Sequence, residues 1–121
     1  MPKTIFLVED DKLNMKLFND LLQVNGYNTV QSIDGRDFLN MVRDNKPDLI
    51  LMDIKLREIS GLDLIKMLKK EAALNAIPVV AVTAFTQKQD KIKIQESGCD
   101  AYIDKPVSVQ KLLDTVSEFL G

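Results

Sequence analysis

Short apolar runs alternate with longer segments of helical periodicity along the whole chain. The runs are rich in β-branched and aliphatic residues and lie at residues 5–8, 27–31, 49–52, 79–82 and 101–103. Crossover helices of about ten to fifteen residues fit between consecutive runs. The pattern predicts an α/β fold, a three-layer sandwich in which five helices cover both faces of a parallel five-stranded sheet.

The first and last helical segments show apolar residues at helical spacing. Leu13, Leu17 and Leu21 recur every four residues in the first segment, so we expect them to form its apolar stripe, with Gly26 just beyond the helix end. The last segment has a longer stripe, formed by Val109, Leu112, Leu113, Val116 and Leu120.

The three central segments carry weaker helix signals. Asp34 is placed to cap the second helix, and Ser60 or Gly61 opens the third. The fourth helix is expected at about residues 86–97, closed by Gly98. Ile92 and Ile94 are its large apolar residues, and their spacing does not put them on one helix face. We therefore expect this helix to be loosely held.

Composition and charge narrow the class of protein. A chain of 121 residues predicts one domain over 1–121, with no output domain after Gly121. The net charge of −2, with both signs mixed along the chain, argues against a nucleic-acid partner. The apolar stretch near the N-terminus is too short for a signal peptide or a membrane span. We expect a cytoplasmic protein with no membrane partner.

The reactive side chains available are carboxylates, hydroxyls and lysines. The sequence has no His, which removes the commonest zinc ligand and general base. Cys99 is the single cysteine, so no disulfide can form within the chain. We expect Cys99 to be a small buried apolar residue, and four methionines to pack in the core: Met15, Met41, Met52 and Met67.

Polar residues follow four of the five predicted strands. In an open sheet of order 2-1-3-4-5, ligands bind beyond the carboxyl ends of the strands, beside the crevice between strands 1 and 3. The residues at those ends are Glu9-Asp10-Asp11, Asp53, Thr83 and Asp104-Lys105-Pro106. Taken singly, each has an ordinary structural explanation. Their joint placement predicts one shared site.

Acidic residues gathered in one crevice repel one another unless a cation offsets their charge. Mg²⁺ takes carboxylates, waters and phosphate oxygens, which matches Glu9, Asp10, Asp53 and a phosphodonor. Phosphoryl transfer requires mainly a positioned nucleophile and neutralised equatorial oxygens. Asp53 can be that nucleophile, with Lys105 and the Thr83 hydroxyl placed to contact the phosphoryl oxygens.

Three neighbours of this site have plainer interpretations. Asp11 is expected to cap the first helix and is left out of the metal shell. Asp104 is expected to be a solvated loop residue. Tyr102 should point to the face opposite Ala101 and Ile103, because side chains alternate along a strand, and it could simply be a half-buried aromatic on an edge strand.

Over nearly its whole length the sequence resembles the receiver domains of response regulators. The residues that carry the resemblance are Val8-Glu9-Asp10, residues 47–53, Ser60-Gly61, Thr83-Ala84 and Lys105-Pro106. Segments at residues 14–18, 77–85 and 98–103 resemble single-domain regulators that act in cell-cycle control. The resemblance implies a flavodoxin-like fold and a two-component phosphorelay.

The resemblance also implies a role for each matching residue. Asp53 would be the phosphoacceptor, and Thr83 and Lys105 would hold the phosphoryl group. Glu9, Asp10, Asp53 and the backbone carbonyl of Lys55 would bind Mg²⁺. Tyr102 would turn inward when Thr83 moves, and the Lys105–Pro106 bond would be cis. The phosphodonor would be a sensor histidine kinase or a histidine phosphotransferase.

One position departs from the family pattern, since Arg57 stands where the family usually has proline. Losing a fixed φ should loosen the loop, and the arginine adds a charge near the phosphate. We expect altered rates of phosphorylation or hydrolysis with the site retained.

Three other functions compete with a phosphorylated receiver. An aspartate-nucleophile phosphohydrolase of the haloacid-dehalogenase type would need a second aspartate at position 55, which is Lys55. A flavin- or nucleotide-binding domain would need Gly, Ser or Thr where Glu9, Asp10 and Asp11 lie. A receiver fold that works as an unphosphorylated adaptor stays open.

The expected output is a protein surface. The loosely held fourth helix, the fifth strand and the last helix are expected to form it, because a weakly packed element can have two arrangements separated by little free energy.

Overall fold

The structure is a computed structural model that describes residues 2–56, 59–84 and 88–121, without the side chains of residues 88–90. A five-stranded parallel sheet of order β2-β1-β3-β4-β5 forms its centre. Its strands are β1 (Thr4–Val8), β2 (Asn28–Ser32), β3 (Leu49–Asp53), β4 (Val79–Thr83) and β5 (Ala101–Asp104). The helices are α1 (Lys12–Val24), α2 (Phe38–Asn45), α3 (Gly61–Lys70), α4 (Lys88–Glu96) and α5 (Val109–Leu120). The predicted α/β fold and strand order are confirmed.

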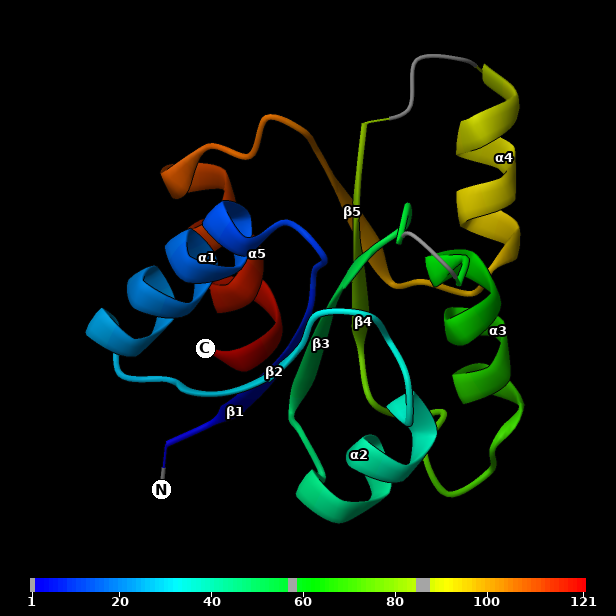
Figure 1. Ribbon diagram of the computed structural model, residues 1–121, viewed down its shortest axis with the longest axis horizontal. Coiled ribbons are helices and arrows are strands. Elements are labelled where there is room, and N and C mark those ends of the chain that lie inside the picture. The colour runs from blue at the N-terminus through cyan, green and yellow to red at the C-terminus, as the bar shows by residue number, and fades with distance from the viewer. Residues whose placement is uncertain (1, 57–58, 85–87) are drawn as a thin grey trace.

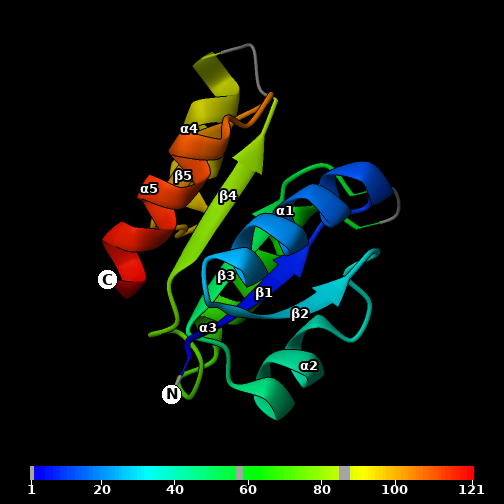
Figure 2. The ribbon, with the colours of Figure 1, turned by 90° about the vertical axis from the view of Figure 1, so that its left-hand side faces the viewer.

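The helices cover both faces of the sheet, which gives three layers (Figures 1 and 2). Alternation along β1 supplies both cores: Ile5 and Leu7 face α1 and α5, whereas Phe6 and Val8 face α2, α3 and α4. Every residue of β3 and β4 is buried, since both strands lie in the sheet interior with helices on each side.

The apolar stripe predicted for α1 is wrong at Leu13 and Leu17, although Leu21 is partly buried against the core. Met15, Phe18 and Leu22 form its buried face, while Leu13 and Leu17 are 81% and 43% exposed. The helix carries two apolar stripes, and the stripe that contains the large Phe18 ring faces the sheet. Leu13 and Leu17 share the outer face with an ion pair between Lys16 and Asp20, in which nitrogen and oxygen are 2.9 Å apart.

The predicted start of α2 is also wrong. Oδ1 of Asp34 accepts from the Arg36 amide at 2.9 Å, within a turn that precedes the helix. Gly35 then has φ +76°, and Asp37, the residue before the helix, has φ 55°. Because these two residues are in left-handed conformations, the helix begins only at Phe38.

The other helix predictions agree better with the structure. Ser60 precedes α3, and Gly26 and Gly98 follow α1 and α4 with positive φ. Leu112 and Val116 of α5 are buried as predicted, whereas Val109 is exposed. The predicted start of the fourth helix at Thr86 lies outside the described residues.

Packing of α4 follows the expected pattern. Ile94 is buried and Ile92 is about half exposed, because the two side chains do not share a helix face. Cys99, after the helix, is partly buried against the same core, and burial raises the pKa of its thiol.

Three of the four methionines expected in the core are buried or partly buried, and Met67 is the exception. It lies on the outer face of α3 and is 47% exposed. None of the helices in the described part of the chain combines the length and the apolar content required to cross a bilayer.

Candidate functional site

The carboxyl ends of β1, β3, β4 and β5 bring together side chains that are far apart in the sequence. Glu9 follows β1, Asp53 ends β3, Thr83 ends β4 and Lys105 follows β5. Glu9, Asp53 and Thr83 are all buried. Because parallel strands share one direction, residues at these four ends must meet at the same edge of the sheet. The predicted convergence is confirmed for these positions.

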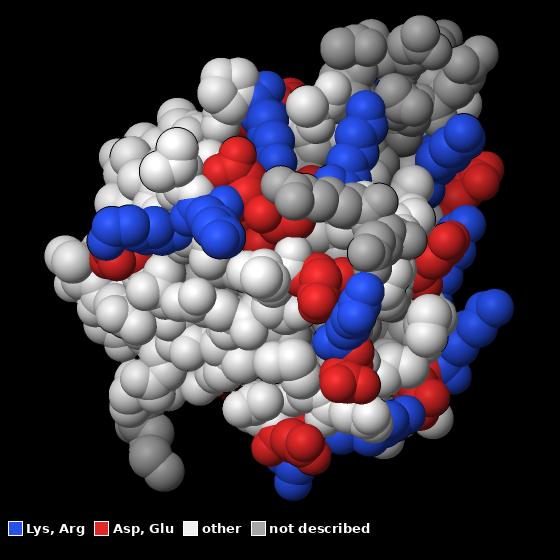
Figure 3. Space-filling model, viewed as in Figure 1, with Lys and Arg blue, Asp and Glu red and all other residues white. Residues whose placement is uncertain are grey.

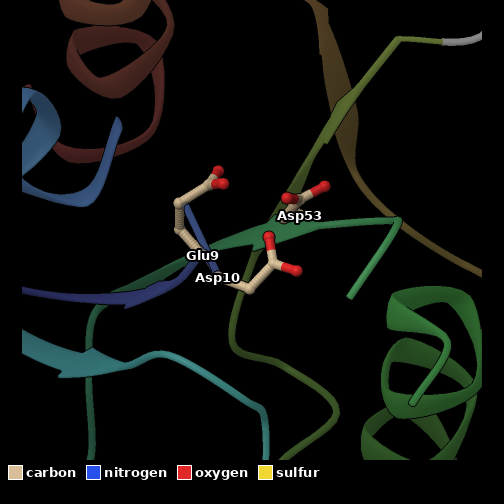
Figure 4. Close-up of side chains that lie close together, drawn as sticks. All are labelled: Glu9, Asp10 and Asp53. Atoms are coloured by element: carbon tan, nitrogen blue, oxygen red, sulfur yellow. The ribbon is translucent and has the colours of Figure 1, made fainter. Parts of the chain in front are cut away.

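Three carboxylates face a common space at this edge. Figure 4 shows Glu9 and Asp10, which follow β1, lying beside Asp53 on β3. One carboxylate oxygen of each residue lies within 4.8 Å of those of the other two. The space-filling view shows acidic side chains gathered here with lysine and arginine side chains around them (Figure 3).

Asp53 is held at both carboxylate oxygens. The Lys55 amide donates to Oδ1 at 3.0 Å, and the Lys105 ammonium donates to Oδ2 at 3.1 Å. The Lys105 nitrogen also lies 3.5 Å from Oε1 of Glu9, which accepts in addition from the Asp11 amide at 3.2 Å. The Asp53 carboxylate therefore has a fixed orientation, because one oxygen accepts from a backbone amide and the other from the Lys105 ammonium.

Burial and the neighbouring Asp53 carboxylate raise the pKa of Glu9. Burial raises its pKa, and the hydrogen bond and negative charge of Asp53 raise it further, to about 7, against the opposing effects of Lys105 and the Asp11 amide. Burial of Lys105 acts to lower its pKa. The carboxylates of Asp53 and Glu9 outweigh this effect, so the pKa of Lys105 is raised.

A hard divalent cation fits the acidic residues. Glu9 Oε2 is the one buried side-chain polar atom in the described part of the chain that lacks a hydrogen-bond partner. The Glu9 carboxylate lies beside two further carboxylates, and its pKa is raised first by burial and then by Asp53, effects that Lys105 does not fully offset. Oxygen ligands at such short separations are what Mg²⁺ or Ca²⁺ requires. The donor chemistry therefore favours a metal at this point.

Thr83 lies next to Lys105 through the backbone. Its carbonyl accepts from the Lys105 amide at 2.7 Å, and Thr83 pairs with Asp104 in the register of β4 and β5. The bond between Lys105 and Pro106 is cis, as the resemblance implies.

Tyr102 lies on the sheet face opposite Ile103, and its side chain is 38% exposed. The alternation predicted for residues 101–103 is thus confirmed. The described structure places Tyr102 at the surface, beside Ala81 of β4 in the strand register.

The plainer interpretation of Asp11 is confirmed, and that of Asp104 is confirmed only for its exposure. Oδ1 of Asp11 accepts from the amides of Leu13 and Asn14 at 2.9 and 3.1 Å, so Asp11 caps α1. Asp104 is exposed, although it is the last residue of β5 and not part of a loop. Arg57 lies outside the described residues.

Sequence reasoning missed the backbone contacts that orient the carboxylates. The amides of Lys55 and Asp11 each hold an acidic side chain, and main-chain donors leave no residue-type signal. Gly61 was expected as a possible helix start and as part of the family resemblance, yet its close approach to the Asp53 backbone was not predicted. A glycine just after the loop that follows a candidate nucleophile was the available signal.

Comparisons with known proteins agree with the fold. The family model described as the response regulator receiver domain matches residues 5–117. The polar-differentiation response regulators DivK of Brucella anthropi and Brucella ovis are 50% and 49% identical over 121 residues, which cover all of this chain and 98% of theirs.

Solved structures give the same result. The signal receiver domain of a signal transduction histidine kinase from Syntrophus aciditrophicus superposes with a TM-score of 0.91 at 30% identity, covering 98% of this chain and 89% of that one. The receiver domain of a sensor histidine kinase from Pseudomonas aeruginosa, described with magnesium in its active-site cleft, has a TM-score of 0.90 at 24% identity and covers 100% and 99%. With the family model matched over nearly its full length and relatives at half identity, this chain belongs to the response regulator receiver domains of two-component systems, close to the DivK cell-cycle regulators.

Proposed function

We propose that the chain accepts a phosphoryl group on Asp53 from a phosphohistidine of a sensor histidine kinase or a histidine phosphotransferase, in a Mg²⁺-dependent reaction. The observation that carries the proposal is the state of the Asp53 carboxylate. The Asp53 side chain is 4% exposed. Its carboxylate is fixed at Oδ1 by the Lys55 amide and at Oδ2 by Lys105, and it lies beside two further carboxylates. A carboxylate arranged in this way is a positioned nucleophile.

Glu9, Asp10, Asp53 and the backbone carbonyl of Lys55 would hold the Mg²⁺. The metal supplies positive charge that neutralises phosphoryl oxygens and the carboxylates themselves. The orphaned Oε2 of Glu9 and the high pKa of this residue support the assignment of Glu9. Lys55 fits because its main chain is fixed by the bridge to Ser60 and by the hydrogen bond to Asp53.

The residues of this chain then have separate tasks in the transfer. An Asp53 oxygen forms the new bond to phosphorus, while the bond between phosphorus and the donor imidazole nitrogen breaks and its electron pair stays on that nitrogen. Lys105 offsets charge on one equatorial oxygen, and the Thr83 hydroxyl donates to another. Because Asp53 and Glu9 already lie within 3.5 Å of Lys105, its ammonium needs little movement to reach the phosphoryl group.

The phosphorylated state would be reported by protein binding. Thr83 and Tyr102 would form the switch, and the α4, β5 and α5 face would bind the downstream protein. Thr83 is buried at the phosphorylation site, whereas Tyr102 lies two residues before Asp104, the strand neighbour of Thr83, and reaches the surface. The packing of α4 supports a shift, since Ile94 alone is buried among its described side chains.

The rest of the proposal concerns the role in the cell. The chain acts as a single receiver domain over residues 1–121, in the cytoplasm, and it signals in cell-cycle or cell-division control. It binds proteins and not nucleic acid, consistent with its net charge of −2. Its only chemistry is self-phosphorylation from a phosphodonor and slow autodephosphorylation.

Intact-mass measurement after incubation with acetyl phosphate and Mg²⁺ tests the proposal. Wild type should gain the mass of one phosphoryl group, and Asp53→Asn should gain none. No mass gain for wild type at any Mg²⁺ concentration would favour the remaining alternative, a receiver fold that works as an unphosphorylated adaptor.

A further inference from the structure

Gly61, the first residue of α3, lies directly against the backbone of the acceptor residue. A Cβ atom added to Gly61 would lie 2.2 Å from the carbonyl oxygen of Asp53 and 2.8 Å from Cα of Ile54. Both distances are shorter than Cβ atoms tolerate, and both neighbours are main-chain atoms that cannot rotate away. The first residue of helix α3 therefore packs directly against the backbone of Asp53, the proposed nucleophile.

The requirement at Gly61 is for space and not for backbone freedom. The described glycines with positive φ are Gly26, Gly35, Gly98 and Gly121, and Gly61 is not among them. An alanine could adopt the Gly61 conformation if it had room for its methyl group. The close approach of α3 to β3 is thus the reason for the glycine.

A short series of contacts links this approach to the Asp53 side chain. The Gly61 amide donates to the Ile54 carbonyl at 2.8 Å, and Lys55 and Ser60 form an antiparallel bridge beside it. The Lys55 amide in turn donates to Oδ1 of Asp53 at 3.0 Å. The main-chain segment that orients the acceptor is therefore the segment on which Gly61 rests.

Neither partner in this contact can easily give way. The Ile54 amide donates to the Val82 carbonyl at 3.0 Å, which ties the end of β3 to β4. Helix α3 is anchored by the fully buried side chains of Ile65 and Leu68. A methyl group at position 61 must therefore displace either α3 or the Asp53–Ile54 peptide by about 1 Å, a misplacement that typically slows a positioned reaction about 100-fold.

We infer that Gly61 is a positioning residue for phosphoryl transfer: its missing side chain sets the separation of α3 and β3 that keeps the Lys55 amide on Oδ1 of Asp53 while Oδ2 faces Lys105. The inference rests on the proposed function of Asp53. It adds a residue that touches neither the metal nor the phosphoryl group.

The test compares Gly61→Ala with Gly98→Ala. Gly98 has φ +91°, and a Cβ there would lie 3.2 Å from Cγ of Lys69, so Gly98→Ala strains the fold at a position away from Asp53. Phosphorylation by acetyl phosphate is measured at saturating Mg²⁺, at a temperature where circular dichroism shows each variant folded. We expect the rate constant of Gly61→Ala to fall about 100-fold. Gly98→Ala should lose stability but keep the wild-type rate.

A second readout is the amide signal of Lys55 in a ¹⁵N-labelled NMR spectrum. The chemical shift of this amide should change in Gly61→Ala and stay the same in Gly98→Ala. A substitution that only destabilises the fold would not produce this difference. If Gly61→Ala does not fold, Ser60→Gly loosens the same bridge without adding atoms, and it should slow phosphorylation and shift the Lys55 signal.

A folded Gly61→Ala variant with the wild-type rate and an unmoved Lys55 signal would overturn the inference, as would a Ser60→Gly variant unchanged in both. Failure of the proposed function looks different, because wild type itself would then not be phosphorylated. In that case the Lys55 signal alone still decides whether Gly61 positions the Asp53 segment.

Discussion

The ammonium nitrogen of Lys105 lies 3.1 Å from Oδ2 of Asp53, although the two residues are 52 positions apart in the chain. The same nitrogen lies 3.5 Å from Oε1 of Glu9. Lys105 is thus a cation that the described part of the chain supplies to these buried carboxylates. It offsets part of their repulsion before any metal binds, and it is placed to do the same for a phosphoryl group.

Replacing Lys105 should have opposite effects on phosphorylation and on magnesium binding. In Lys105→Ala, phosphorylation by acetyl phosphate at saturating Mg²⁺ should slow about 100-fold, the usual loss when one charge-stabilising donor is removed. Magnesium affinity should rise in the same variant, because a competing positive charge has left the carboxylates. Rate measurements and a magnesium titration check the two effects.

The matched control is Lys16→Ala, which breaks an exposed ion pair with Asp20 on the outer face of α1. It should change neither the rate nor the magnesium affinity. A Lys105→Ala variant with weaker magnesium binding would contradict the assignment, since it would mean that the ammonium does not oppose the metal.

The raised pKa of Glu9 predicts a pH dependence of stability in the metal-free protein. Below about pH 4.5 Glu9 is protonated in both the folded and the unfolded state, so it imposes no penalty. Between about pH 4.5 and about pH 7 the unfolded state loses this proton first, and the free energy of unfolding falls as pH rises. Above the folded-state pKa of Glu9, the free energy of unfolding has lost the full amount that burying this charge costs.

Urea unfolding across this pH range, with Glu9→Gln beside wild type, measures the effect. The variant should be more stable than wild type above about pH 7, with a flatter profile, because it buries no charge at this position. Adding Mg²⁺ should stabilise wild type above that pH far more than the variant. A variant that loses stability relative to wild type at high pH would show that Glu9 is not strained in the metal-free fold.

The orientation of α1 can be tested by paired leucine substitutions. Leu22 is fully buried, so Leu22→Ala should lower the free energy of unfolding by about 2–5 kcal/mol. Leu13 is 81% exposed, and Leu13→Ala should change it by less than about 0.5 kcal/mol. A larger loss for Leu13→Ala than for Leu22→Ala in urea unfolding would favour the stripe that the sequence predicts over the one in the structure.

This helix also shows where sequence reasoning fails. The positions of the strands follow from the apolar runs, and β3 and β4 are buried throughout. The order of the strands is that of a flavodoxin-like sheet and does not follow from the runs themselves. Helix α1 carries two apolar stripes, and spacing alone cannot decide which one faces the sheet. The contacts of Phe18 with residues from distant strands decide it, and those contacts exist only in the folded chain.

The candidate site was largely predictable for a related reason. Glu9, Asp53, Thr83 and Lys105 each stand directly at a strand end, so topology alone brings them together. The hydrogen bonds of the Lys55 and Asp11 amides and the fit of Gly61 against Asp53 depend on the path of the loops. Apart from the glycine at position 61, the residue types in these loops do not specify that path.

Asp100, at the amino ends of β4 and β5, should contribute to stability and not to phosphorylation. Oδ2 of Asp100 accepts from the Lys69 ammonium at 3.0 Å and from the Val79 amide at 2.8 Å, which ties α3 and β4 to the turn before β5. Asp100→Ala leaves the Val79 amide without this acceptor and should cost about 1–3 kcal/mol. Phosphorylation of the folded variant should proceed at the wild-type rate, because the carboxyl ends of the strands are untouched. A large loss of rate without loss of stability would contradict this separation.

The most direct measurement locates the phosphoryl group itself. Borohydride reduces an aspartyl phosphate to homoserine, so peptide mass mapping after phosphorylation and reduction identifies the modified residue. We predict homoserine at position 53 after incubation with phosphodonor and Mg²⁺, and unchanged aspartate when the metal is removed by chelation. Modification at another acidic residue, or none in the peptide that contains Asp53, would contradict the account.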